Sequence, residues 1–145
     1  MGIMLEEKQE LPKELSGDMS SRTAGSFEGL KTFCIDNDID VLNGMNALLG
    51  SWQCDVYSCM TLTEALDVPF RPQIMLSDYQ LDNDETGIQV MTALRKKFGE
   101  DLPGVLITAD PRAEVEEQAR ELGFYFLRKP VKPAALRALI RRLIR

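Results

Sequence analysis

The sequence predicts an α/β fold in which five parallel strands form one sheet and helices cover both of its faces. Four short, continuously apolar runs have the character of buried parallel strands. Segments with the periodicity of amphipathic helices separate these runs, as expected for repeated β/α units. The four runs are residues 30–35, 74–77, 105–107 and 124–128, and the polar residues that follow them begin at Asp36, Asp78, Thr108 and Lys129.

The first two β/α units are predicted between residues 30 and 66. A helix at 38–49 follows the first strand, and Gly50 is expected to end it. A short second strand at 54–57 precedes a capping-box pattern, Thr61 with Glu64, which opens a brief helix. The inner face of the longer helix is expected to carry Val41, Met45, Leu48 and Leu49.

The remaining three units are predicted between residues 74 and 144. The strand at 74–78 leads through an acidic loop, 80–87, into a helix that ends at Phe98. After the strand at 105–108, Pro111 is expected to open a helix that Gly123 ends. The strand at 124–128 is followed by a last helix from Pro133. The expected inner residues of these helices are Ile88, Met91, Leu94 and Phe98, then Val115, Ala119 and Leu122, then Leu136, Leu139, Ile140 and Leu143.

Length and composition indicate one soluble domain. The chain has 145 residues; residues 1–27, rich in small and polar residues, are expected to be a linker or disordered lead-in, and 28–145 the folded domain. No apolar stretch approaches the roughly 18 residues of a membrane span, so no membrane contact is expected. A net charge of −6 argues against nucleic-acid binding. The three cysteines are an odd number without metal-site spacing, which is typical of reduced thiols and a cytoplasmic location.

The absence of histidine restricts the chemistry. It excludes Ser-His catalysis and His-ligated zinc, and a phosphohistidine donor would have to lie in another domain or protein. What remains at the strand ends is a set of carboxylates, a hydroxyl and an ammonium group. Carboxylates suit Mg²⁺, and an aspartate can attack phosphorus to form an acyl phosphate. Because strand ends of a parallel sheet meet at one edge, these groups are expected to form one site.

The chain resembles the response-regulator receiver domains of two-component signalling. The resemblance covers about Leu30 to Ile144 and is carried by FCIDND, IMLSDYQLDNDETG, VLITAD and FLRKPVKPAALRALI. It implies a flavodoxin-like (βα)5 fold with strand order 2-1-3-4-5. It also implies Asp78 as phosphoacceptor and a Mg²⁺ site made by Asp36, Asn37, Asp78 and the backbone carbonyl of Gln80. Thr108 and Lys129 would contact the phosphoryl group, Thr108 and Phe126 would form the switch, and the Lys129–Pro130 bond would be cis.

Further expectations about context follow from the same resemblance. The implied donor is a histidine kinase or a histidine phosphotransfer domain. The lead-in and the basic C-terminal helix are similar to receivers at the end of hybrid sensor histidine kinases, whose parent chain would be the enzyme; a free-standing receiver is the alternative. The domain itself is expected to catalyse only its own phosphorylation and dephosphorylation. Asn37 departs from the family, which usually has a second carboxylate at this position.

Other functions remain open from the residues alone. A pseudo-receiver would keep the fold as an interaction module, with Asn37 reflecting lost metal use. The Asp36-x-Asp38-x-Asp40 pattern is also found in haloacid-dehalogenase-type phosphatases, but a later acidic pair and a cap segment are missing. As a calcium loop it lacks the required Gly and Glu. The basic stripe Arg137, Arg141, Arg142 and Arg145 is most simply a solvated face, with an acidic partner or a homodimer contact as the alternatives.

Overall fold

The computed structural model describes residues 27–144, in which five strands alternate with five helices. The strands form one parallel sheet in the order β3-β2-β4-β5-β6, which is the predicted order 2-1-3-4-5 counted along the chain. The elements are β2 (Lys31–Ile35), α1 (Ile39–Ser51), β3 (Asp55–Cys59), α2 (Leu62–Leu66), β4 (Ile74–Ser77), α3 (Gly87–Phe98), β5 (Gly104–Thr108), α4 (Ala113–Glu121), β6 (Tyr125–Arg128) and α5 (Pro133–Leu143).

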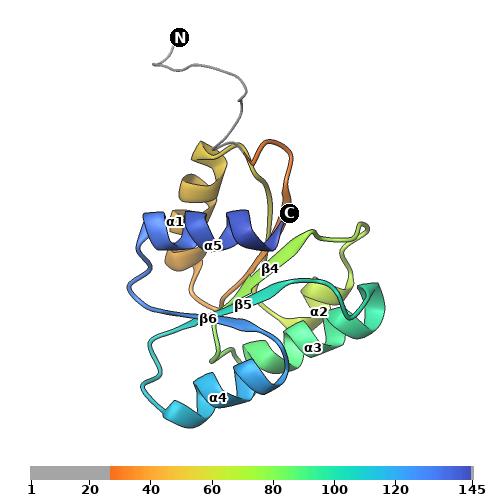
Figure 1. Cartoon of the computed structure of the whole chain (residues 1–145). Helices are drawn as coiled ribbons and strands as arrows, with labels where there is room; N and C mark the ends of the chain where they lie inside the picture. Colours follow the sequence, from red (N-terminus) through yellow and green to blue (C-terminus); the bar gives the residue numbers. More distant parts are fainter. Residues whose placement is uncertain (1–26, 145) are drawn as a thin grey trace.

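Helices cover both faces of the sheet and form a three-layer sandwich (Figure 1). Helices α1 and α5 pack on one face, whereas α2, α3 and α4 pack on the other. The central strands β4 and β5 are buried along their whole length, as their continuous apolar sequences predict. On the first face the core includes Leu42, Leu49, Leu136 and Ile140; on the second it includes Val90, Met91, Leu94, Val115 and Ala119.

The register of the sheet brings the carboxyl ends of β2 and β4 side by side. Ile35 pairs with Ser77, and Ser77 pairs with Leu106 on the next strand. The backbone ladder continues one residue further, because the Asp78 amide donates to the Ile35 carbonyl at 2.9 Å. The aspartates that follow the two strands, Asp36 and Asp78, are therefore neighbours although 42 positions separate their strands in sequence, as the pairing of Ile35 with Ser77 requires.

Helix α1 differs from its predicted form. It continues through Gly50 to Ser51, and the residue with positive φ at its end is Gln53, at 68°. Gly50 has no need of the left-handed conformation because the chain turns three residues later. Leu42, which the predicted inner face omitted, is buried, whereas Val41, Met45 and Leu48 are only partly buried.

Helix α4 departs from expectation in its first residue and in the exposure of Leu122. It begins at Ala113, two residues after Pro111, and ends at Glu121. The prediction that Leu122 faces the core was wrong: it is 43% exposed, because it is the C-cap and no longer follows the helical repeat. Gly123 has a φ of 78°, which explains why a glycine ends this helix.

The described region begins at Phe27, and the rest of the expected lead-in, residues 1–26, lies outside it. Phe27, assigned by sequence to that lead-in, is buried and meets the Trp52 ring edge-on at a centroid distance of 5.8 Å. The Arg137 guanidinium lies 5.8 Å from the Phe27 ring centre and 5.4 Å from that of Trp52. These contacts attach the start of the domain to α1 and α5.

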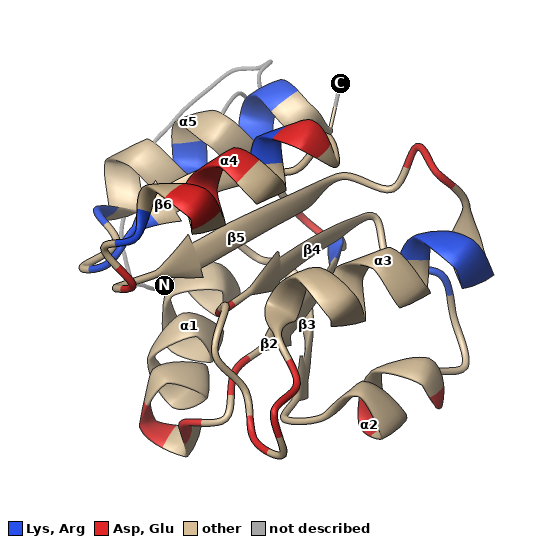
Figure 2. Ribbon diagram, turned by 90° about the horizontal axis from the view of Figure 1, so that it is seen from below, with Lys and Arg blue, Asp and Glu red and all other residues tan. Residues whose placement is uncertain are grey.

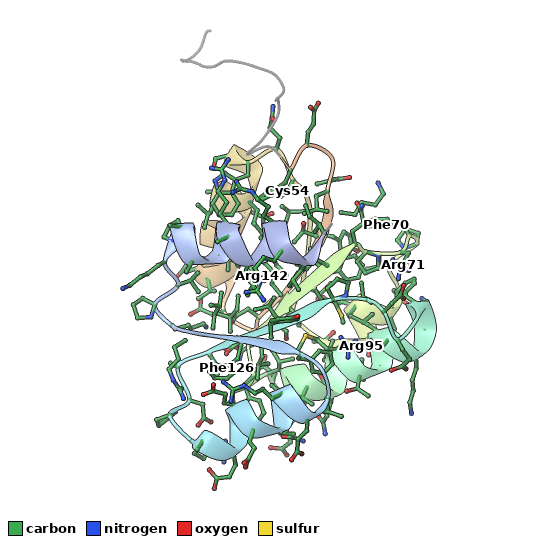
Figure 3. All side chains as sticks on the ribbon, viewed as in Figure 1. Cys54, Phe70, Arg71, Arg95, Phe126 and Arg142 are labelled. Carbon is green, nitrogen blue, oxygen red and sulfur yellow. The ribbon has the colours of Figure 1, made fainter. Side chains whose placement is uncertain are left out.

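Arg95 joins three segments on the helix-rich face of the sheet. Its guanidinium on α3 donates to the carbonyls of Leu102, Leu122 and Gly123 and stacks on the Phe124 ring at 4.2 Å (Figure 3). This arrangement fixes the turns that lead into β5 and β6. Within residues 27–144 no helix is long and apolar enough to cross a membrane, and the three cysteines are free thiols.

Candidate functional site

Two carboxylates and one ammonium group meet at the carboxyl edge of the sheet. The Lys129 Nζ lies 3.2 Å from Asp36 Oδ2 and 3.4 Å from Asp78 Oδ2. The Asp36 side chain is 7% exposed and that of Asp78 is 14% exposed, so the group is largely shielded from solvent. Asp36 follows β2, Asp78 follows β4 and Lys129 follows β6. The convergence predicted from the strand ends is present for these three residues. Figure 2 shows acidic residues in the loops after β2 and β4.

The backbone holds both aspartates in place. Asp36 Oδ1 accepts the amide of Asp38 at 2.9 Å, and Asp78 Oδ1 accepts the amide of Tyr79 at 2.8 Å. In each carboxylate one oxygen is bound by the backbone while the other faces Lys129. Each carboxylate is thereby oriented toward the Lys129 ammonium.

Burial raises the pKa of Asp78 above its ordinary value of 3.8; the ammonium of Lys129 opposes this shift and the nearby carboxylate of Asp36 adds to it. Asp78 ionises more readily in the unfolded chain than in the folded protein. Its ionisation therefore destabilises the fold. The loss of stability is absent well below pH 3.8, grows as the pH rises through the elevated pKa, and reaches its full size above that pKa.

The substitution Asp78→Asn is expected to stabilise the protein at neutral pH by on the order of 1 kcal/mol, as is common when a functional site gives up a costly charge. The gain should shrink as the pH falls and vanish below pH 3.8, where the carboxyl is protonated in both states. Urea unfolding of both proteins across this range measures it. A gain that stays constant with pH would show that the ionisation of Asp78 is not its cause.

Thr108 ends β5 and Phe126 lies on β6, and the hydrogen bonds and ring contacts described for their side chains involve other groups. Thr108 is buried at the end of β5; its Oγ1 accepts the Asp110 amide at 3.1 Å and its carbonyl accepts the Lys129 amide at 3.1 Å. Phe126 is half-buried on the edge strand β6, packs against the core, and has the Arg128 guanidinium 5.0 Å from its ring centre (Figure 3). The Lys129–Pro130 peptide bond is cis, as the resemblance implied.

Asn37 and Gln80 provide neutral oxygens near the carboxylates. The Asn37 Nδ2 donates to Asp82 Oδ1 at 3.0 Å, which leaves its own Oδ1 unused by that bond. Gln80 pairs with Thr86 in an isolated antiparallel β-bridge. The hydrogen bonds on either side join the Gly87 amide to the Tyr79 carbonyl and the Leu81 amide to the Glu85 carbonyl, and they do not use the Gln80 carbonyl. Asp38, which follows Asn37, caps α1 by accepting the Asp40 amide.

The donor set fits Mg²⁺. Magnesium ions prefer oxygen ligands and are commonly held by one or two carboxylates with several waters retained. Among residues 27–144 no three His, Cys, Asp or Glu side chains are grouped as a cluster able to hold a metal. Two carboxylates, Asp36 and Asp78, with the oxygens of Asn37 and Gln80, agree with the magnesium pattern and not with a protein-only cage. A cavity of about 50 Å³ lies beside Asp36, Asp78 and Lys129, and the rest of its lining is mostly apolar.

Gly87 is a site residue that sequence reasoning missed. A Cβ at this position would lie far inside van der Waals contact of the Asp78 carbonyl oxygen and 2.5 Å from Ser77 Oγ. The Gly87 amide also donates to the Tyr79 carbonyl at 2.7 Å. Helix α3 therefore begins directly against the backbone of Asp78. A signal was present in the sequence, because Thr86 and Gln89 form a capping box that places Gly87 in the first helical turn.

An arginine in the loop after β5 was also missed. Arg112 forms a paired contact with Asp110, including Nη2 to Oδ2 at 2.6 Å, and lies 5.8 Å from the centre of the Tyr79 ring. Hydrogen bonds from Arg112 lower the pKa of Asp110 to about 2. The contact between Arg112 and the Tyr79 ring joins the loop after β5 to the loop after β4. Sequence offered no signal for it, since the partners come from different loops.

The fold and the site together define a class: an α/β domain with two acidic residues, a threonine and a lysine on successive strand ends. The sequence model of the response regulator receiver domain matches residues 32–141. The chain belongs to this family and is a receiver domain of two-component response regulators.

Solved receiver structures share the fold. A receiver domain protein from Clostridium thermocellum superposes with a TM-score of 0.71 at 20% identity, over 79% of this chain and 93% of that one. The chemotaxis response regulator CheY4 of Vibrio cholerae gives 0.69 at 21%, over 79% and 98%. The BeF3-activated DrrB receiver domain gives 0.71 at 20%, over 80% and 97%. A sequence search of curated proteins found no match.

Proposed function

We propose that this domain accepts a phosphoryl group on Asp78 in a Mg²⁺-dependent reaction, with the phosphohistidine of a histidine kinase or phosphotransfer domain as donor. The observation that carries the proposal is the position of the Lys129 ammonium between Asp36 and Asp78. Such a group can neutralise an incoming phosphoryl oxygen beside a carboxylate nucleophile. Family membership supports the reaction class.

We infer the course of the transfer from the positions of these groups. A carboxylate oxygen of Asp78 attacks phosphorus, forming an acyl phosphate as the bond to the donor nitrogen breaks; the leaving imidazole keeps the electron pair. Asp36, Asn37, Asp78 and the Gln80 carbonyl would hold Mg²⁺, which supplies neutralisation of the phosphoryl charge. Lys129 gives up its contact with Asp78 Oδ2 and pairs with a phosphoryl oxygen. Partial burial strengthens these interactions.

The switch is proposed to run from Thr108 to Phe126. The Thr108 hydroxyl would donate to a phosphoryl oxygen, and this movement would disturb its bond from the Asp110 amide. The space left beside β5 would admit the half-buried Phe126 ring. One hydrogen bond is worth about 1 kcal/mol, so phosphorylation would shift the balance severalfold. The surface that reports phosphorylation to other proteins would be formed by α4, β6 and α5.

The wider setting is part of the same proposal. A cytoplasmic domain at the C-terminus of a hybrid histidine kinase agrees with the thiols that are free in the structure and with the basic residues along α5 (Figure 2). The oligomer that we propose is a homodimer formed through the exposed face of α5. The runner-up function is a pseudo-receiver, which one observation favours: Asn37 stands where the family usually has a carboxylate and already bonds Asp82.

Treatment of the wild-type protein with acetyl phosphate separates these two functions. With Mg²⁺ present, intact mass is expected to rise by one phosphoryl group, and chelation of the metal with EDTA should prevent the increase. The phosphorylated fraction should be labile to hydroxylamine, as an acyl phosphate is. If the mass stays unchanged at saturating Mg²⁺ while the protein remains folded, the pseudo-receiver function replaces the proposed one.

A further inference from the structure

The hydrogen bond between Asn37 and Asp82 connects the two loops that border the carboxylates. The Asn37 Nδ2 lies 3.0 Å from Asp82 Oδ1. A carboxylate can only accept, so the amide must present its NH2 group to Asp82 and turn its oxygen away. The orientation of the Asn37 side chain is therefore determined by Asp82, and the amide oxygen is left available on the other side.

The loop that carries Asp82 is built as a tight turn. The Glu85 amide donates to the Asp82 carbonyl at 3.1 Å, and the Leu81 amide donates to the Glu85 carbonyl at 3.0 Å. Asn83 and Asp84 between them have φ values of 59° and 61°. Asn and Asp tolerate this left-handed conformation better than other residues with side chains. The turn thus presents Asp82 to Asn37 as a defined structural feature.

The negative charge of Asp82 compensates for the charge that an asparagine at position 37 lacks. An amide has one negative charge fewer than the carboxylate usual at this position, and its oxygen is a weaker ligand for a divalent cation. An N–H···O⁻ bond is charge-assisted and polarises the amide, increasing the negative charge on its oxygen. Partners behind a metal ligand act in this way, by fixing its rotamer and raising its basicity. Asp38 does not take this role, because its carboxylate caps α1.

We propose that Asp82 is a positioning residue for Mg²⁺: through Asn37 Nδ2 it orients and polarises the amide so that Asn37 Oδ1 serves as a ligand. This inference rests on the proposed Mg²⁺ site and extends it to a residue outside the donor set. Asn37 and Asp82 together take the place of a single carboxylate ligand. The site then keeps its charge, with one negative group displaced to the loop after β4.

Mg²⁺ titration of the unphosphorylated protein tests the inference by binding alone, followed through amide chemical shifts. Asp82→Asn is expected to weaken Mg²⁺ binding roughly threefold to tenfold, less than for a buried partner because the pair is exposed. The matched control is Asp84→Asn, which removes the same charge from the same turn and suits the left-handed backbone. It should change the affinity less than about twofold. The difference in Mg²⁺ affinity between the Asp82→Asn and Asp84→Asn variants should persist at about 1 M salt, where the Debye length is only about 3 Å.

Two double variants show whether Asp82 acts through Asn37. In an Asn37→Ala background, adding Asp82→Asn should have no more effect than adding Asp84→Asn. In an Asn37→Asp background, adding Asp82→Asn should not weaken binding, because a carboxylate at 37 ligates without help. Equal effects of Asp82→Asn and Asp84→Asn in the wild-type background would overturn the inference while the Mg²⁺ site stands. Absence of Mg²⁺ binding by the wild-type protein would overturn the inference and the proposed cofactor together.

Discussion

Replacement of Asp78 with alanine is expected to abolish phosphorylation by acetyl phosphate. Asp78 is the carboxylate at the end of β4 that faces Lys129, at 3.4 Å, with the Asp36 carboxylate beside it. Alanine leaves no oxygen to attack phosphorus. Intact mass at saturating Mg²⁺ should show full incorporation for the wild-type protein and none for the variant.

The control for this experiment is Asp84→Asn, which removes an acidic side chain from the loop after β4 without touching the site. Its incorporation should equal that of the wild-type protein. Peptide mapping of the phosphorylated wild-type protein should place the group on the peptide that contains Asp78. A phosphoryl group retained in Asp78→Ala would assign the acceptor to another residue and contradict the mechanism proposed for Lys129.

The second large effect is expected from Gly87→Ala, the smallest substitution available at this position. The added methyl group would collide with the Asp78 carbonyl oxygen and lie 2.5 Å from Ser77 Oγ, so the backbone of Asp78 must move. Overpacking of this kind costs about 1–3 kcal/mol of stability. Displacing the nucleophile by about 1 Å can slow a reaction roughly 100-fold. Both a lower urea midpoint and a rate of phosphorylation reduced by about this factor are expected.

Gly44→Ala is the matched control, since Gly44 lies within helix α1 and nothing stands within 4 Å of the added Cβ. There alanine should stabilise the protein by about 0.5–1 kcal/mol through higher helix propensity and leave phosphorylation unchanged. The opposite responses of two glycines to the same substitution would assign the effect at 87 to contact with Asp78. A Gly87→Ala protein phosphorylated at the wild-type rate would show that α3 can shift without disturbing the site.

The sequence determined the fold and the general position of the site. Continuous apolar runs predicted the buried strands β2, β4 and β5, and the polar residues after them predicted which edge holds the chemistry. Asp36, Asp78 and Lys129 lie together as expected, because parallel strands place their carboxyl ends on one edge. Local rules worked where the cause was local: Pro133 begins α5, and Gly123 with its positive φ ends α4.

Tertiary structure alone decided the contacts between loops. Asn37 meets Asp82 across 45 positions, and Arg112 meets Tyr79, because side chains at loop ends choose partners by distance in space. The burial of Leu42 and the exposure of Leu122 likewise depended on where each helix stops against the sheet. The role of Gly87 depended on how closely α3 approaches Asp78, a distance that helical periodicity does not contain. Sequence patterns report the environment of each segment, whereas a functional site is assembled between segments.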